Sequence, residues 1–185
     1  DRTMPEEINR VLTDAAADLL WTPSPDGDEN LLREGIPAER IERVGNIMID
    51  SLEMMRGSIE ADSTCADLGF AGKRYALVTL HRPGNVDDPA KLRTLVEQLR
   101  AVSQSLPLLF PVHPRTRNRL QQQDLWRDLE QCQAISLLEP QPYIAFMNLL
   151  FQASAVITDS GGLQEETSYL GIPCLTVRPN TERPV

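Results

Sequence analysis

The chain has 185 residues, of which 41% are hydrophobic and 24% charged, a composition typical of one large globular domain or parts of two. Its formal net charge of −9 argues against a broad surface for nucleic acid or membrane, although local arginines could still bind a small anion. No apolar run approaches the roughly 20 residues of a membrane-spanning helix, and the polar, acidic start predicts no signal peptide. Cys65, Cys132 and Cys174 fit no zinc spacing and no disulfide framework, so we expect reduced thiols in a cytoplasmic protein.

The first 45 residues predict a helix, a short strand and a second helix. The first helix is expected from Pro5 to Leu20, since apolar side chains recur on one face. The strand is expected at residues 19–22, and a Pro/Asp/Gly cluster at residues 23–28 predicts a turn before the next helix. Gly45-Asn46 is typical of a passage between two units, and residues 60–74 read as irregular and polar. We therefore divide the chain into residues 1–45 and 46–185.

From Tyr75 onward, short apolar runs alternate with helical patterns. Strands are expected at residues 76–80, 108–112, 134–138, 155–158 and 174–177. Helices are expected from Pro89 to Val102, around residues 117–125, at residues 143–152 and from Gly162 to near Gly171. Such alternation predicts an α/β fold with a Rossmann-like parallel sheet and helices on both faces.

Asp159-Ser160-Gly161-Gly162 lies where an apolar strand passes into a helix. Glycine permits a sharp turn and a close approach of the backbone to a ligand. The N–H groups and the dipole at a helix start then favour an anion such as a diphosphate. The alternative is an ordinary helix whose N-cap is Asp159 or Ser160.

Both histidines of the chain follow apolar strands, in His81-Arg82 and in His113-Pro114-Arg115. The carboxyl ends of parallel strands face the ligand crevice, so we expect both histidines at that edge, beside Asp159. A histidine can transfer a proton near neutral pH, and an arginine can clamp a phosphate. Each histidine taken alone is better explained as a hydrogen-bonded loop residue, but the position of both at strand ends favours a functional role.

Two pairs of glutamates begin helices, Glu6-Glu7 and Glu165-Glu166. Acidic residues in a first helical turn complement the dipole, which suffices to explain them. One of the second pair could instead accept hydrogen bonds from ribose hydroxyls. Residues 178–183 are expected to form a charged loop. This loop is either exposed to solvent or places one of its arginines against a bound diphosphate. The chain holds no Gly-x-Gly-x-x-Gly, Walker, His-Glu-x-x-His or Gly-x-Ser-x-Gly motif.

Six motifs occur in a fixed order along the chain, and together they resemble the non-hydrolysing UDP-N-acetylglucosamine 2-epimerases. The motifs are Pro5-Glu6-Glu7-Ile8-Asn9-Arg10, Gly45-Asn46-Ile47-Met48-Ile49-Asp50, Thr79-Leu80-His81-Arg82-Pro83, Pro111-Val112-His113-Pro114-Arg115, residues 158–166 and Asn180-Thr181-Glu182-Arg183-Pro184. The resemblance covers nearly the whole chain, and the ordered set is far more specific than any single motif.

The resemblance implies a GT-B fold, in which two Rossmann-like domains face each other across a cleft. Residues 1–45 would end the first domain, and residues 46–185 would form most of the second, nucleotide-binding domain. The implied reaction interconverts UDP-N-acetylglucosamine and UDP-N-acetylmannosamine by elimination and re-addition of UDP, without a redox cofactor or a metal. The implied partner is the UDP-sugar substrate, and the full-length protein is expected to be a homodimer.

The resemblance also assigns roles to individual residues. Glu6 and His81 match catalytic residues of the family. The residues implied to bind UDP are Gln141 and Phe146 for uridine, Glu166 for ribose, and Ser160, Gly161, Gly162 and Arg183 for the diphosphate. Arg82 and His113 resemble residues near a second, regulatory UDP-sugar site of bacterial members.

Two departures from the family pattern stand out. Gly84 replaces the usual Glu of His-Arg-Pro-Glu-Asn, which is expected to loosen the loop that carries His81. The family's first domain also supplies an aspartate and a further glutamate that would lie upstream of Asp1, so we expect the isolated chain to be inactive. A GT-B glycosyltransferase and a non-catalytic UDP-sugar-binding module are the alternatives. The sequence does not decide which UDP-hexosamine is the substrate.

Overall fold

The computed structural model describes residues 5–178, which form two compact units that divide between Ser51 and Leu52. The sequence-based boundary at Gly45-Asn46 lies shortly before helix α3 (Ile47–Ala61), and Gly45 has a positive φ of 87°. No helix among the described residues is long and apolar enough to cross a bilayer. Cys65, Cys132 and Cys174 are all free thiols, as expected.

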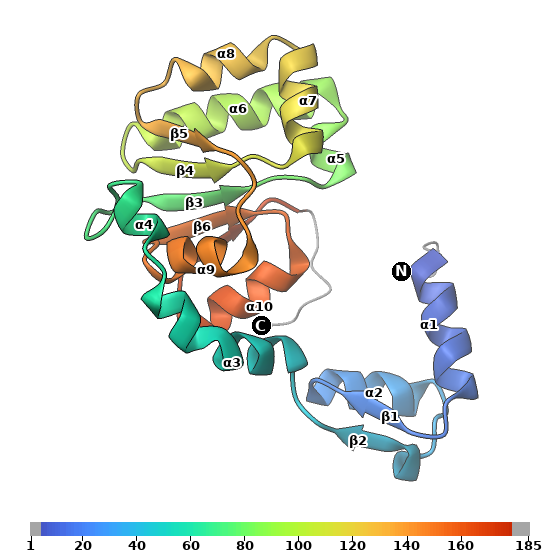
Figure 1. The fold of residues 1–185 in the computed structure, drawn as a ribbon. Helices are drawn as coiled ribbons and strands as arrows, with labels where there is room; N and C mark the ends of the chain where they lie inside the picture. Colours follow the sequence, from blue (N-terminus) through green and yellow to red (C-terminus); the bar gives the residue numbers. More distant parts are fainter. Residues whose placement is uncertain (1–4, 179–185) are drawn as a thin grey trace. The chain divides into compact units, whose positions relative to one another are not determined.

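The first unit contains a two-stranded parallel sheet (Figure 1). Its elements are α1 (Pro5–Ala16), β1 (Leu20–Thr22), α2 (Pro25–Arg33), a 3₁₀ turn (Ala38–Arg40) and β2 (Ile41–Arg43). The predicted strand at residues 19–22 is confirmed, but the helix predicted to reach Leu20 ends at Ala16. The sequence analysis missed β2, whose Ile41-Glu42-Arg43 carries too little periodicity to be recognised without its partner strand.

The second unit is built on a five-stranded parallel sheet in the order β5-β4-β3-β6-β7. The strands are β3 (Ala76–Thr79), β4 (Leu108–Pro111), β5 (Ile135–Leu138), β6 (Ala155–Thr158) and β7 (Cys174–Thr176). The chain builds β4 and β5 on one side of β3 and then returns to place β6 on the other side. The order therefore reverses between β3 and β6, which is where ligands bind in open α/β sheets.

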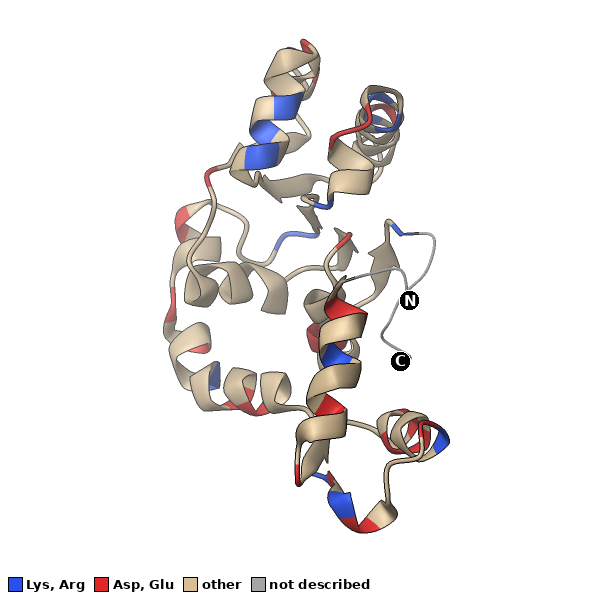
Figure 2. Ribbon diagram, turned by 90° about the vertical axis from the view of Figure 1, so that its right-hand side faces the viewer, with Lys and Arg blue, Asp and Glu red and all other residues tan. Residues whose placement is uncertain are grey.

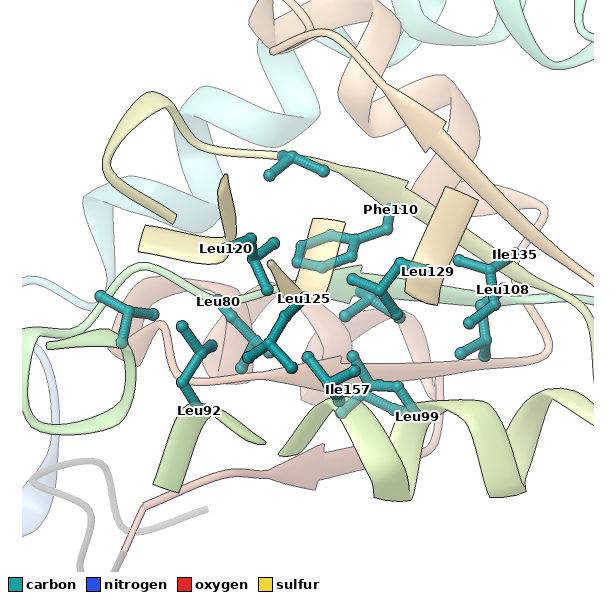
Figure 3. Close-up of a cluster of buried hydrophobic side chains, with 14 of the residues drawn as sticks. Leu80, Leu92, Leu99, Leu108, Phe110, Leu120, Leu125, Leu129, Ile135 and Ile157 are labelled. Carbon is teal, nitrogen blue, oxygen red and sulfur yellow. The ribbon is translucent and has the colours of Figure 1, made fainter. Parts of the chain in front are cut away.

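Helices cover both faces of this sheet, as the alternation of patterns predicted (Figure 1). One face packs against α6 (Pro89–Ser103), α7 (Pro114–Gln122) and α8 (Leu125–Glu130). The other face packs against α4 (Thr64–Asp67), α9 (Tyr143–Phe151), α10 (Gly161–Leu170) and the part of α3 that begins at Leu52. Side chains of successive strand residues point to opposite faces: Val78 joins the first cluster, shown in Figure 3, and Leu77 the second. Both sides of each central strand are thus buried, which explains their continuous apolar sequences.

The helix expected around residues 117–125 is two helices. The chain turns at Asp124, which has a left-handed conformation with φ of 58° and precedes α8. Asp and Asn adopt this conformation more readily than most residues, because a short polar side chain can hydrogen-bond locally. The sequence analysis also missed the short helix α5 (Pro83–Val86), which follows His81-Arg82 directly.

Gly84 lies in α5, so the segment expected to be a loosened loop is a helical turn. A Cβ built at Gly84 meets no atom within 4 Å, and its φ is not positive. We therefore expect Gly84→Ala to stabilise the protein by about 0.5–1 kcal/mol, because alanine restricts the unfolded chain without straining the native backbone. Urea denaturation measures the change, and Gly72→Ala is the control. Gly72 has φ of +70°, so the same substitution there is expected to be destabilising.

Candidate functional site

The site begins with two neighbouring strand ends, His81 after β3 and Asp159 after β6. Asp159 is 0% exposed, and its carboxylate accepts hydrogen bonds from the backbone N–H of His81 at 3.0 Å and of Arg82 at 2.8 Å. The Asn85 side-chain amide donates to it at 3.1 Å, and His81 Nδ1 lies 3.0 Å from the other carboxylate oxygen. One buried carboxylate therefore organises the whole segment from His81 to Asn85.

This contact fixes the orientation and the hydrogen-bonding state of the His81 ring. Burial by itself raises the pKa of Asp159, but the hydrogen bonds from His81, Arg82 and Asn85 outweigh it and hold the pKa below its usual range. Because an ionised carboxylate only accepts, we infer that His81 Nδ1 carries the proton facing Asp159. His81 Nε2 is then left as the ring atom able to accept a proton, the arrangement expected of a histidine base.

His113 lies at the same edge of the sheet, after β4, and its ring centroid is 5.8 Å from that of His81. Its Nδ1 accepts a hydrogen bond from the Arg115 backbone N–H at 3.2 Å, which caps helix α7. The structure thus gives His113 a local role in a loop and also places it beside His81. Arg82 directs its Nε to the carbonyl oxygen of Asp159 at 3.3 Å.

Three arginines along α7, visible as blue bands in Figure 2, are engaged with carboxylates. Arg119 Nε donates to Asp87 at 3.0 Å, and Arg115 also pairs with Asp87, whose pKa it lowers. Arg117 pairs with Glu139. Asp87 follows α5 directly, so these pairs link the His81 segment to the helix that begins at His113. An arginine row that is already paired is a poor candidate for the anion site.

The start of α10 lies directly after Asp159. Ser160 occupies the N-cap position, but its side chain makes no capping hydrogen bond. The alternative of an N-cap at Ser160 is thus confirmed for the position of the residue but not for a capping side chain, and the Asp159 carboxylate turns to His81 instead. The Ser160 backbone N–H donates to Thr158 Oγ1 at 3.0 Å, so this amide, expected to face a diphosphate, is already paired. The helix start at Gly161 and Gly162 is left to provide the N–H groups that have no partner within the helix.

Glu166 lies one and a half turns into α10 and is 6% exposed. Burial raises its pKa above the usual range, and the Tyr143 hydroxyl donates to its carboxylate at 3.2 Å. Burial and the nearby Glu166 charge raise the pKa of Tyr143 to about 12. The carboxylate is thus held between α9 and α10, with capacity to accept further hydrogen bonds.

Gln141 and Phe146, predicted to line a uridine pocket, flank the start of α9. Gln141 Nε2 donates to the Glu139 carbonyl oxygen at 2.8 Å, which holds the turn before the helix. Phe146 is half-buried and packs against the hydrophobic cluster on that face of the sheet. Both residues therefore have structural contacts of their own.

Comparison with known proteins identifies the family. The family model for UDP-N-acetylglucosamine 2-epimerase matches residues 1–185, the entire chain. The chain belongs to the UDP-N-acetylglucosamine 2-epimerase family.

Individual relatives agree with this assignment. The chain is 40% identical over 189 residues to a UDP-N-acetylglucosamine 2-epimerase of Methanococcus maripaludis, covering 100% of this chain and 52% of the relative. It is similar to the crystal structure of the Methanocaldococcus jannaschii UDP-GlcNAc 2-epimerase in complex with UDP-GlcNAc and UDP, with a TM-score of 0.87 and 40% identity, covering 100% of this chain and 52% of that one. It is also 37% identical over 183 residues to a UDP-2,3-diacetamido-2,3-dideoxy-D-glucuronate 2-epimerase of Pseudomonas aeruginosa, covering 97% of this chain and 49% of the relative.

The chain spans about half the length of the curated relatives that it matches. Over that half, the predicted α/β fold with a Rossmann-like parallel sheet is confirmed, and the match to solved epimerases agrees with the expected GT-B type.

Two predicted site residues of this epimerase-family chain lie outside the described part of the second unit. Glu6 is exposed in the first turn of α1, in the first unit. Its neighbour Glu7 is paired with Arg10 at 2.9 Å, so of the two glutamates Glu6 is the one outside that ion pair. Arg183 lies outside the described residues.

The sequence analysis did not predict the contacts that three residues make in the candidate site. Asp159 was expected beside the histidines, in the anion motif or as a cap, but its direct pairing with His81 was not predicted. Asn85 and Tyr143 were not singled out, although they hold Asp159 and Glu166. The first of these could have been found, because an aspartate directly after a buried strand, next to the histidine-bearing strand, is typical of a histidine partner.

Proposed function

We propose that this chain supplies the nucleotide half of a UDP-N-acetylglucosamine 2-epimerase, which interconverts UDP-N-acetylglucosamine and UDP-N-acetylmannosamine. The observation that carries the proposal is the junction of β3 and β6, where Asp159 holds His81 next to the start of α10. A residue that can transfer a proton and a helix start that can stabilise an anion therefore lie close enough to act on the same bound ligand. Membership of the epimerase family supports the same reading.

The reaction needs both features. Elimination of UDP places negative charge on the departing diphosphate, which fixed donors stabilise far better than water does. We assign this task to the backbone N–H groups of Gly161 and Gly162 at the start of α10, to the Ser160 hydroxyl, which makes no capping hydrogen bond, and to Arg183. Removal and return of the proton at C2 need a positioned base and acid, which we assign to Glu6 and His81 together with groups from the rest of the enzyme. No step in this scheme requires a metal or a redox cofactor.

The remaining assignments concern recognition. Glu166 is placed to accept hydrogen bonds from ribose hydroxyls, and its link to Tyr143 fixes the carboxylate for that role. Gln141 and Phe146 line the uridine side, and Arg82 with His113 would contribute to a second, regulatory UDP-sugar site. The proposal further includes a homodimer of the full-length protein, in the cytoplasm. UDP-N-acetylglucosamine is the proposed substrate rather than a further modified hexosamine, since the family model and two relatives that are 40% identical carry that name.

Calorimetric titration of the 185-residue chain with UDP tests the nucleotide assignment. We expect UDP to bind and uridine to bind much more weakly, because only UDP brings the diphosphate to the helix start. Glu166→Gln is expected to weaken UDP binding about tenfold, through the loss of charge-assisted hydrogen bonds to the ribose. Glu97→Gln, an exposed position on α6, is the matched control and should change nothing. Equal affinity for UDP and uridine, or no affinity for either, would contradict the assignment.

A further inference from the structure

Asn85 joins two parts of the sheet edge through a single side-chain nitrogen. Its Nδ2 donates to Asp159 Oδ2 at 3.1 Å and to the carbonyl oxygen of Val177 at 2.9 Å. The first acceptor follows β6, and the second follows β7 directly. The two N–H bonds of one amide group therefore connect the turn after β3 to two neighbouring strands.

Both acceptors need this donor. Asp159 is fully buried and ionised, so each N–H around it offsets part of the cost of removing the charge from water. Val177 continues the pairing of β7 with β6 through its own N–H, which donates to the Thr158 carbonyl oxygen at 2.7 Å. In a continuing parallel ladder the Val177 carbonyl would accept from the Ser160 N–H, but that N–H donates to Thr158 Oγ1 instead, so the ladder leaves the carbonyl to Asn85.

The backbone favours this geometry. Pro83 presets the φ angle for the first turn of α5, and the N–H groups of Asn85 and Val86 donate to the Arg82 carbonyl oxygen at 2.9 and 3.1 Å. The turn places Asn85 on the side of Asp159, while Asp87 at its end pairs with Arg115 and Arg119 of α7. A segment of four residues is thereby anchored at both ends.

We propose that Asn85 is a positioning residue for His81. Its side-chain amide is one of the donors around the Asp159 carboxylate, and it also donates to the backbone after β7. These two hydrogen bonds fix the segments that follow β3, β6 and β7 relative to one another. The consequence for the reaction rests on the proposed function, since it requires His81 to act on the substrate. The effect on the His81 ring itself does not.

The state of the His81 ring provides a direct measurement. The chain contains only two histidines, so two-bond ¹H–¹⁵N spectra of the histidine-labelled chain, with His113→Gln for assignment, report which nitrogen of His81 carries the proton. In the unsubstituted chain without nucleotide, we expect the Nδ1–H form. Asn85→Ala should produce a mixture of the two tautomers, because Asp159 loses a donor and its hold on His81 weakens. Asn118→Ala, at an exposed position on α7, is the matched control.

Asn85→Asp and Asn85→Leu separate positioning from packing. Aspartate has nearly the shape of asparagine but cannot donate, and it would bring a second carboxylate close to Asp159. If Asn85 acts as a donor, Asn85→Asp should disturb the His81 tautomer more than Asn85→Ala and should weaken UDP binding several-fold. If it merely fills space, Asn85→Leu, which has a similar size, carries no charge and cannot donate, should leave the His81 tautomer as in the unsubstituted chain.

The outcomes distinguish the two proposals. An unchanged His81 tautomer in Asn85→Ala and Asn85→Leu, each shown to be folded by its far-UV circular dichroism, overturns the positioning role whether or not UDP binds. Failure of the unsubstituted chain to bind UDP overturns the proposed function, and the tautomer measurement without nucleotide still decides the role of Asn85.

Discussion

Asp159→Asn is expected to lower the free energy of unfolding of residues 52–185 by about 3 kcal/mol, within the range for breaking a buried, hydrogen-bonded charge. The carboxylate accepts from the backbone N–H groups of His81 and Arg82 and from the Asn85 amide. An asparagine amide keeps one acceptor oxygen, but its NH₂ group would face donors and leave them unsatisfied. Urea denaturation followed by circular dichroism measures the loss.

The lowered pKa of Asp159 also predicts how the stability difference between the unsubstituted chain and Asp159→Asn depends on pH. The pKa of Asp159 is lowered in the folded protein, so its stabilising contribution is present above the unfolded value of about 3.9 and is lost as the pH falls through the lowered folded value. We therefore expect the stability difference between the unsubstituted chain and Asp159→Asn to be constant near neutral pH and to shrink in acid. Asp124→Asn is the control, since Asn tolerates the left-handed conformation of Asp124 equally well. An equal loss at both positions would contradict the special role of Asp159.

The 185-residue chain is expected to bind UDP but to show no measurable epimerisation of UDP-N-acetylglucosamine. The family resemblance places a catalytic aspartate and a glutamate upstream of Asp1, and the chain spans about half of its relatives. A positioned proton-transferring group contributes about 10²- to 10⁴-fold in rate, so the loss of two predicts a fall of at least about 10⁴-fold. A coupled assay for UDP-N-acetylmannosamine, run beside the full-length Methanocaldococcus jannaschii enzyme, measures it.

Two further measurements sharpen this test. UDP titration of the same sample shows that any inactivity does not come from a misfolded nucleotide site. Joining the upstream half of the Methanocaldococcus jannaschii protein to Asp1 should raise the rate, and His81→Asn in the joined protein should remove that gain. Turnover by the 185-residue chain comparable with that of the full-length enzyme would refute the requirement for upstream residues.

The sequence was sufficient to predict those parts of the fold that depend on local patterns. The strands β3, β4 and β6 were recognisable because a strand buried on both faces must be continuously apolar, and the edge strands β5 and β7 were recognisable from short apolar runs although they are less buried. The α6 helix followed from its periodicity, with Leu92, Val96 and Leu99 buried as expected, whereas Val102 is 40% exposed near its end. The local patterns failed at β2 and α8: β2 depends on pairing with β1, and α8 on the turn at Asp124.

The candidate site, like the fold, has features that local sequence patterns predict and features that depend on tertiary structure. The sequence by itself determined that His81, His113 and the Gly161-Gly162 helix start belong at the carboxyl edge of a parallel sheet, because each directly follows a strand. Only the tertiary structure decided what Asp159 does, since its donors lie 74 to 78 residues away in the chain and meet it only because β3 pairs with β6. The link between Tyr143 and Glu166 likewise depends on the packing of α9 and α10. A buried carboxylate is stable only where donors converge on it, and that convergence is a property of strand order, which no local pattern encodes.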